Sequence, residues 1–325
     1  MKLSHTLRCL AGGALLAAGA LAQAATLTVT HWGSGMYGAP FAVALEKGYF
    51  KDAGLDVTGF ITSKGGGTTV RNAMASDIPY GEVALPAAIA AAKSGVKLTI
   101  VHGGVISLAD LLWVADKGSP IRSIADMKGK KLGYSSPKSV TDMVSTIALD
   151  KAGILGQVDR QAVGGLGSAL TALREGAVDV IYMLEPVMSK ESGTLELAFT
   201  SSASIPHMTQ TVGIVQTDYL KKHPDTIKAI IEARRKGVEF IEKNPDEAGD
   251  LLARQYKLDP AIARSAIRSI MKSGSPYWSR GGLDYEGMDA MLGGLRLVKA
   301  LDDAPFDWST LVDESLLPAD QRSKK

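Results

Sequence analysis

Residues 44–57 read ALEKGYFKDAGLDV and join two segments of different periodicity. Before them lie a β-rich run at 26–31 and a helical stretch at 40–46, and a second β-rich run follows at 57–62. Short β-rich runs separated by helical stretches predict parallel strands joined by helical crossovers. We therefore expect residues 26–62 to form a βαβ unit, and the chain to be an α/β protein.

The same alternation continues to about residue 216. Further expected strands are residues 82–85, 98–102, 111–115, 131–134, 177–184 and 210–216, and further expected helices are residues 68–76, 86–93, 140–151 and 168–175. From His223 onward the β-rich runs stop, and Pro224 to Lys243 reads as an amphipathic helix with apolar residues on one face. An α/β body with a helical C-terminal extension is the expected architecture.

The first 24 residues have the pattern of a secretory signal peptide. Lys2 and Arg8 precede an apolar run of 12 residues, and the small side chains of Ala22 and Ala24 suit cleavage after Ala24. The apolar run is shorter than the roughly 20 residues that span a bilayer as a helix. We expect the mature chain, residues 25–325, to be soluble and periplasmic.

Cysteine content and charge exclude several classes of function. Cys9 is the only cysteine, so a chain cleaved after Ala24 has no disulfide, no Cys-rich metal site and no thiol nucleophile. Cleavage also removes two of the 36 basic side chains, which leaves 34 against 34 acidic ones. This balance argues against binding nucleic acid, which requires clustered Lys and Arg. With 46% hydrophobic residues, the chain has enough apolar side chains for a large core.

Several short segments resemble one protein family. Residues 44–57 closely resemble the opening βαβ unit of the periplasmic binding proteins of nitrate, sulfonate, taurine and thiamine-precursor ABC importers. Further similar segments follow in the family's order: IADMKGKKLG at 124–133, LREGAVD at 173–179, EP at 185–186, YLKKHP at 219–224 and EKNPDEA at 242–248. The resemblance covers about residues 26–265, nearly the whole mature chain.

This resemblance implies a two-lobed periplasmic-binding-protein fold of type II, in which each lobe is a mostly parallel sheet flanked by helices. Lobe 1 would comprise residues 25–112 and 217–325, and lobe 2 residues 113–216. The lobes would close over a small molecule in the cleft between them, and the closed complex would dock on an ABC permease in the inner membrane. On this reading the chain is a receptor and not an enzyme, and it has no cofactor.

Candidate ligand contacts follow from the predicted sheets. Open parallel sheets place their binding crevice beyond the carboxyl ends of the strands. Trp32 and Tyr37 follow the first strand and offer flat apolar faces with a polar edge, suited to stacking on a ligand. The alternative is that both pack between helix and sheet. Neighbouring His31 fits a ligand contact or a hydrogen-bonded interior histidine equally well.

Two glycine- or hydroxyl-rich turns open helices and suit an anion. The first contains Ser63, Gly66, Gly67 and Thr68, and its backbone N–H groups would cradle an anion unless it is only a tight turn. The second places hydroxyl groups at a strand-to-helix junction, at positions Ser135, Ser139 and Thr141. A carboxylate, sulfonate or nitrate would fit there, and Ser139 can cap the helix at the same time.

The remaining candidates end strands or lie near the cleft. Glu185 follows the apolar strand at 177–184 and would accept a hydrogen bond from a ligand amine or ring N–H, or else form a salt bridge across the lobes. Pro86 and His102 also end strands and are further candidates. Arg71 would reach an anionic ligand or form an outward salt bridge.

Enzyme classes fit less well. Residues 33–38, GSGMYG, match the GxGxxG of a dinucleotide site, but Thr62 and Ser63 end the second strand where a ribose-binding acid is needed. Relatives that make a thiamine pyrimidine carry a Cys-rich motif, which the mature chain lacks. No HExxH or GxSxG sequence is present. No metal site is expected.

The sequence leaves the ligand open. The hydroxyl-rich helix starts favour a small organic anion, either a sulfonate or a carboxylate, whereas Glu185 and the aromatic residues favour a pyrimidine-like or other planar nitrogenous nutrient. Docking on a sensor protein instead of a permease would use the same cleft. A monomer suits a shuttle, although no sequence feature sets the oligomeric state. The segment after Pro305 has little of the family pattern.

Overall fold

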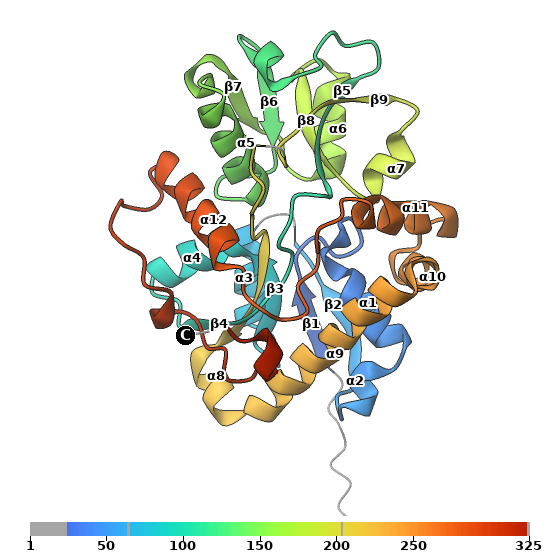
Figure 1. Ribbon diagram of the computed structural model, residues 1–325, viewed down its shortest axis with the longest axis vertical. Helices are drawn as coiled ribbons and strands as arrows, with labels where there is room; N and C mark the ends of the chain where they lie inside the picture. Colours follow the sequence, from blue (N-terminus) through green and yellow to red (C-terminus); the bar gives the residue numbers. More distant parts are fainter. Residues whose placement is uncertain (1–24, 64–65, 203, 324–325) are drawn as a thin grey trace, which may run out of the picture.

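Figure 1 shows the computed structural model, which describes residues 25–63, 66–202 and 204–323. Two lobes lie one above the other, each built on a five-stranded sheet. The predicted signal peptide, residues 1–24, lies outside the described residues.

The first sheet has the strand order β2-β1-β3-β10-β4. Four of its strands run in one direction, and β10 runs antiparallel between β3 and β4. The strands are β1 (Ala25–Val29), β2 (Val57–Ile61), β3 (Tyr80–Ala84), β4 (Leu98–Gly103) and β10 (Thr211–Gln216). The carboxyl ends of β1 and β3 therefore meet at one edge of the sheet, facing the second lobe.

Helices surround this sheet and form the C-terminal third of the chain. They are α1 (Ala39–Glu46), α2 (Tyr49–Asp52), α3 (Gly66–Met74), α4 (Leu85–Lys93), α8 (Thr217–Lys222), α9 (Pro224–Lys243), α10 (Pro245–Tyr256), α11 (Pro260–Met271) and α12 (Tyr285–Leu297), with short 3₁₀ turns at Met36–Gly38, Trp308–Thr310 and Ala319–Gln321. Proline begins α9, α10 and α11, where its fixed φ and missing N–H suit a helix start. The expected helical extension is confirmed.

The second sheet has the order β7-β6-β8-β5-β9, with β5 antiparallel to both of its neighbours. Its strands are β5 (Leu111–Asp116), β6 (Lys131–Tyr134), β7 (Asp159–Ala162), β8 (Val180–Leu184) and β9 (Leu195–Thr200). The helices of this lobe are α5 (Val140–Lys151), α6 (Leu166–Arg174) and α7 (Val187–Glu191), with 3₁₀ turns at Ile124–Met127 and Leu155–Gln157. Each sheet is thus mostly parallel with one reversed strand.

The chain passes between the sheets twice, at residues 104–110 and 201–210, of which the structure describes all but residue 203. We call these the crossing segments. Sheet membership corrects the lobe boundaries expected from the sequence: residues 211–216 pair with β3 and β4 in the first sheet, and residues 111–112 pair with β8 and β9 in the second. A buried apolar run predicts a strand, but its pattern does not say which of two sheets the strand joins.

All eight expected strands are present, and two more were missed. β7 and β9 lie at the two edges of the second sheet. β7 reads Asp-Arg-Gln-Ala with no buried residue, and β9 leaves Leu197 exposed. Edge strands have one unpaired side and are commonly short and polar, so they lack the apolar run by which strands are recognised.

The C-terminal segment wraps onto the first lobe. Leu311 and Asp313 exchange backbone hydrogen bonds with Ile100 of β4, at 2.8 and 2.9 Å, and Leu317 is buried. Trp308 donates its indole N–H to Asp289 of α12 at 2.8 Å. Across the two lobes, α12 packs on α5 and α11 packs on α7. No helix in the described part of the chain combines the length and apolar character needed to cross a membrane.

Candidate functional site

A small cavity lies between the two lobes, and we call it the interlobe cavity. Its volume is about 20 Å³, room for roughly one water molecule. Residues from both lobes line it: Thr30, His31, Tyr37, Gly66 and Ala84 from lobe 1, and Ser135, Ser139, Val140, Thr141 and Leu184 from lobe 2. Most of them stand at the carboxyl ends of strands or at the starts of α3 and α5, which is where open α/β sheets bind ligands.

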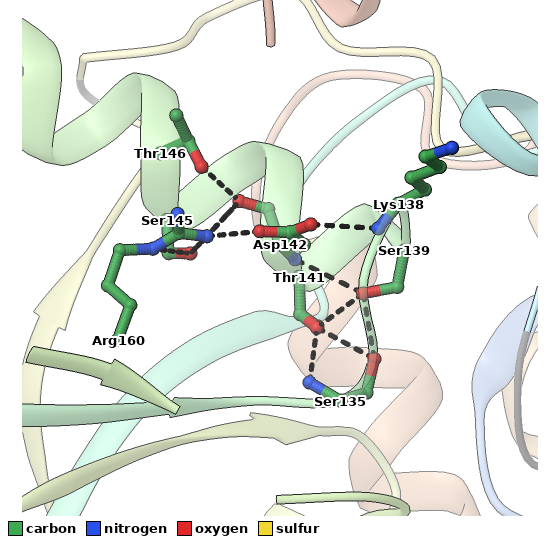
Figure 2. Close-up of polar contacts among 8 residues, drawn as sticks. All are labelled: Ser135, Lys138, Ser139, Thr141, Asp142, Ser145, Thr146 and Arg160. Carbon is green, nitrogen blue, oxygen red and sulfur yellow. Dashed lines mark hydrogen bonds and ion pairs between the residues drawn. The ribbon is translucent and has the colours of Figure 1, made fainter. Parts of the chain in front are cut away.

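Ser135, Ser139 and Thr141 form a cluster of hydroxyl groups that we call the hydroxyl cradle (Figure 2). Ser135 Oγ lies 2.9 Å from Ser139 Oγ and 2.8 Å from Thr141 Oγ1, and the Ser135 N–H donates to Thr141 Oγ1 at 2.9 Å. All three residues are buried. Hydroxyl groups rotate, so these three can reorient their hydrogens toward an acceptor placed in the cavity.

The cradle sits on the N-terminus of α5. Ser139 is the N-cap, and its Oγ accepts the N–H of Asp142 at 3.2 Å. The first N–H groups of a helix have no intrahelical acceptor, and Val140 and Thr141, the first two residues of α5, line the cavity. Because the N-terminal end of a helix carries a partial positive charge, this arrangement favours a negatively charged ligand.

Asp142 and Arg160 hold this turn in place. The carboxylate of Asp142 pairs with Arg160 and accepts the backbone N–H of Lys138 at 2.8 Å. Arg160 also donates to the Asp142 carbonyl oxygen at 2.9 Å and to Ser145 Oγ at 3.0 Å. Lys138 has a left-handed φ of 61°, which the bond to Asp142 helps to fix. Arg160 thus offsets a carboxylate that would otherwise repel an anion at the helix N-terminus.

Tyr37 and His31 form the aromatic wall of the cavity, with ring centroids 5.7 Å apart. Tyr37 is buried, and its hydroxyl donates to Gln210 Oε1 at 2.8 Å. Burial raises the pKa of Tyr37 well above 10 and lowers the pKa of His31 to about 4. Both side chains are therefore uncharged near neutral pH, and His31 can donate or accept a hydrogen bond but brings no positive charge.

Gln210 connects this wall to both crossing segments. Its amide nitrogen donates to Asp110 Oδ1 at 2.8 Å and to the Ser107 carbonyl oxygen at 2.5 Å. Asp110 is fully buried, and desolvation raises the pKa of its carboxyl group to about 6. Neither Gln210 nor Asp110 was predicted, because buried amides and acids in connecting segments carry no periodic signal.

Three predicted contacts from lobe 1 lie away from the cavity. Trp32 stacks on Phe60, with ring centroids 4.0 Å apart, and packs edge-on against Tyr256 at 5.0 Å. Pro86 is buried near the start of α4. His102 is fully buried in the first sheet, where its ring contacts the Tyr80 hydroxyl at 2.7 Å and the Gly103 carbonyl oxygen at 2.8 Å. The alternative of packing between helix and sheet fits Trp32 better, and Pro86 and His102 are buried within lobe 1.

The predicted anion-binding turn at the start of α3 contributes residues to two different spaces. Gly66 lines the cavity, whereas Gly67 faces a neighbouring groove between α3 and α4. Ser63 Oγ lies 2.5 Å from Thr69 Oγ1, and Thr68 accepts a hydrogen bond from Arg71 at 2.9 Å. Residues 64–65 of this predicted anion cradle lie outside the described residues.

Glu185 lies directly after Leu184, which reaches the cavity, but Glu185 itself turns toward its own lobe. Its Oε2 accepts the N–H of Ser189 in α7 at 3.1 Å, and the side chain is buried. The expected salt bridge across the lobes is not among the ion pairs of the described residues. Glu185 instead supports the start of α7.

The glycine-rich run at 33–38 serves packing in lobe 1. A Cβ on Gly38 would overlap the Tyr256 hydroxyl and the ring of Trp32. Met36–Gly38 forms a 3₁₀ turn, and the Met36 carbonyl oxygen accepts the indole N–H of Trp278 at 2.9 Å. The overlap with Tyr256 and Trp32 accounts for Gly38 without a nucleotide. The described residues contain no group of three His, Cys, Asp or Glu side chains positioned for a metal ion.

Comparisons with known proteins agree with the family resemblance. A model of the NMT1/THI5-like family matches residues 36–248. A binding protein of Brucella abortus strain 2308 is 27% identical over 235 residues, which cover 71% of this chain and 70% of the relative. The formylaminopyrimidine-binding protein of Halalkalibacterium halodurans is 24% identical over 260 residues, covering 77% and 78%.

The fold is also found among solved structures. The periplasmic aliphatic sulphonate binding protein of Escherichia coli superimposes with a TM-score of 0.69 at 16% identity, over 86% of this chain and 87% of that one. The expected two-lobed fold of type II periplasmic binding proteins is confirmed.

Proposed function

The chain belongs to the NMT1/THI5-like family, and from this premise we propose that it is a periplasmic receptor that captures a small organic anion between its lobes for an ABC importer. The observation that carries the proposal is the hydroxyl cradle on the N-terminus of α5, which lies in a cavity lined by both lobes. The anion would be a carboxylate or a sulfonate.

The described residues that line the cavity suit an anion. They include no Asp or Glu, His31 has a pKa of about 4, and Arg160 offsets the nearby carboxylate of Asp142. Hydroxyl groups and helix N–H groups bind an anion by hydrogen bonds without a fixed countercharge. A cation would find no carboxylate in the lining and would face the positive end of α5.

Ligand capture would proceed by lobe closure. At about 20 Å³ the cavity is too small for a carboxylate or sulfonate with a carbon chain, so entry requires the lobes to separate. The crossing segments at 104–110 and 201–210 are the only backbone connections between the two sheets in the described chain, and they would absorb the rotation. A ligand with contacts on both lobes then stabilises the closed form over the open one.

A pyrimidine-like ligand is the second candidate. Tyr37 and His31 offer aromatic faces at the cavity wall, and one relative is a formylaminopyrimidine-binding protein. Uncharged His31 would pair with a ring nitrogen as donor or acceptor. An enzymatic role has less support, since the cradle hydroxyls bond mainly to each other and none contacts a basic side chain among the described residues.

The test is a calorimetric titration of the mature chain with taurine, small sulfonates, carboxylates, nitrate and pyrimidines. We expect one anion class to bind, and Thr141→Val to weaken its binding at least tenfold, because a hydrogen bond to a charged group contributes about 1.5–3 kcal/mol. Thr171→Val, at an exposed position of α6, is the matched control and should leave affinity unchanged. Binding of pyrimidines alone, or anion binding that Thr141→Val leaves unaltered, would refute the anion site.

A further inference from the structure

A groove runs along the first lobe between α3 and α4, next to the interlobe cavity, and we call it the α3–α4 groove. Its volume is about 610 Å³, within the range of roughly 300–1,000 Å³ typical of small-molecule sites. Its floor is apolar and includes Val70, Met74, Ala87 and Ala91. The small alanines of α4 leave the groove open along its length.

Both lobes form this groove. Pro137 and Lys138 of lobe 2 complete its wall, and they belong to the same turn as Ser135 and Ser139 of the hydroxyl cradle. On the lobe 1 side, Gly66 lines the cavity and Gly67 lines the groove. One turn from lobe 2 therefore covers both spaces, and its withdrawal when the lobes open would join them.

Gly66 packs closely on the start of α4 between the cavity and the groove. A Cβ placed on Gly66 would lie 2.8 Å from the Cβ of Ala87, so the backbone of α3 already touches the start of α4 at this point. Gly66 and Ala87 both belong to lobe 1, so a ligand that occupies both spaces would pass on the lobe 2 side, beside the turn at 135–139.

The charges of the groove select an anion. Among the described residues that line the groove, Arg71 and Lys138 are the charged ones, and none is Asp or Glu. Both are exposed, and neither forms an ion pair within the described chain; Arg71 contacts only the Thr68 hydroxyl, at 2.9 Å. Figure 2 shows the Lys138 side chain extending away from the cradle, and the nearby carboxylate of Asp142 is paired with Arg160.

Building on the proposed function, we propose that the ligand is an elongated organic dianion. One anionic end occupies the hydroxyl cradle, an apolar middle lies over Val70 and Met74, and the second anionic end lies between Arg71 and Lys138. Each lobe then supplies one cation to the distal end as well as contacts to the proximal end. The second charged end of the ligand would further stabilise the closed form over the open one.

Length-matched pairs of anions test this proposal by calorimetric titration. The pairs are hexanoate with hexanedioate, benzoate with benzene-1,4-dicarboxylate, and propane-1-sulfonate with 3-sulfopropanoate. For wild type we expect the dianion of at least one pair to bind tenfold or more tightly than its monoanion. Arg71→Gln and Lys138→Gln should each weaken that dianion by roughly threefold to fivefold, as for partly exposed ion pairs, and leave the monoanion within twofold.

Three further variants complete the design. The double variant should abolish the preference for the dianion, and Ala91→Leu, which fills the groove, should weaken the dianion more than the monoanion. Lys51→Gln, on exposed α2, is the matched control for loss of one positive charge. Equal binding of mono- and dianions, or a preference that survives the double variant, would overturn the proposal. If Thr141→Val still weakens the monoanion in that case, the proposed function stands; if no anion binds, both fail.

Discussion

Replacement of Arg160 by glutamine tests whether a charge outside the cavity holds the hydroxyl cradle. Arg160 pairs with Asp142, and the two side chains are 15% and 7% exposed. Removing one partner of a buried pair costs about 3–5 kcal/mol. Asp142 keeps the N–H of Lys138 as a donor, and Arg160 is partly exposed, so we expect Arg160→Gln to lower the free energy of unfolding by about 2–3 kcal/mol.

The same substitution should weaken anion binding. Without the positive charge of Arg160, the negative charge of Asp142 repels the bound anion more strongly. At a separation of about 8 Å and an effective dielectric constant of about 20, the repulsion is about 2 kcal/mol. This corresponds to a loss of affinity of roughly thirtyfold.

Urea denaturation followed by circular dichroism measures the first effect, and calorimetric titration with the bound anion measures the second. The double variant Arg160→Gln/Asp142→Asn removes both charges and should recover most of the lost affinity, because the repulsion is gone while an Asn oxygen still accepts the Lys138 N–H. An Arg160→Gln protein with wild-type stability and affinity would refute this account of the turn. So would a double variant that binds as weakly as the single one.

Three further predictions concern the core and the crossing segments. The pKa of Asp110 is raised from 3.8 to about 6. Between these two pH values the folded protein keeps a proton that the unfolded chain has lost. The contribution of protonated Asp110 to the free energy of unfolding is therefore complete below about pH 4 and is lost as pH rises through about 6. As pH rises from 4 to 7, the free energy of unfolding of Asp110→Asn should increase by about 3 kcal/mol relative to that of wild type. Urea titrations in which the difference between the two proteins stays constant over this pH range would contradict this. Trp32→Ala should lower the free energy of unfolding by about 2–3 kcal/mol through lost stacking, and change the affinity measured by calorimetry less than threefold. A large loss of affinity in a stable protein would indicate that Trp32 contacts the ligand. Gly38→Ala should lower the melting temperature through overlap with Tyr256, at a cost of about 1–3 kcal/mol, and an unchanged melting temperature would argue against the packing role of this glycine.

Much of the fold could be predicted from the sequence because buried strands and capped helices leave local signals. The helix expected at 140–151 has those bounds in the structure, since Ser139 caps it and Gly153 follows its end. Edge strands β7 and β9 left no such signal. Assignment of β10 to the first sheet also could not be predicted, because it depends on pairing between residues more than 100 positions apart.

Position after a strand predicted which loops reach the cavity but not which way each side chain points. Tyr37, Gly66, Ser135, Ser139 and Thr141 lie at the cavity, and so does His31. Trp32 follows the same strand as Tyr37 but turns into the lobe 1 core. Its neighbour His31 has a left-handed φ of 53°. This change in chain direction before Trp32 could not be predicted from the residue pattern. Thr30, Ala84, Val140 and Leu184, which complete the lining, are small or apolar and resemble ordinary core residues in the sequence.

A distance measurement across the lobes shows whether an anion that binds between them also closes them. Cleavage after Ala24 would leave a chain without cysteine, so Asp77→Cys in lobe 1 and Gln157→Cys in lobe 2 provide two exposed sites for spin labels. Pulsed electron paramagnetic resonance would then compare the distance distribution with and without a saturating anion. We expect the anion to replace a broad distribution by a narrower and shorter one, and Thr141→Val to require more anion for the same change. An anion that binds with no change in the distribution would contradict capture by lobe closure.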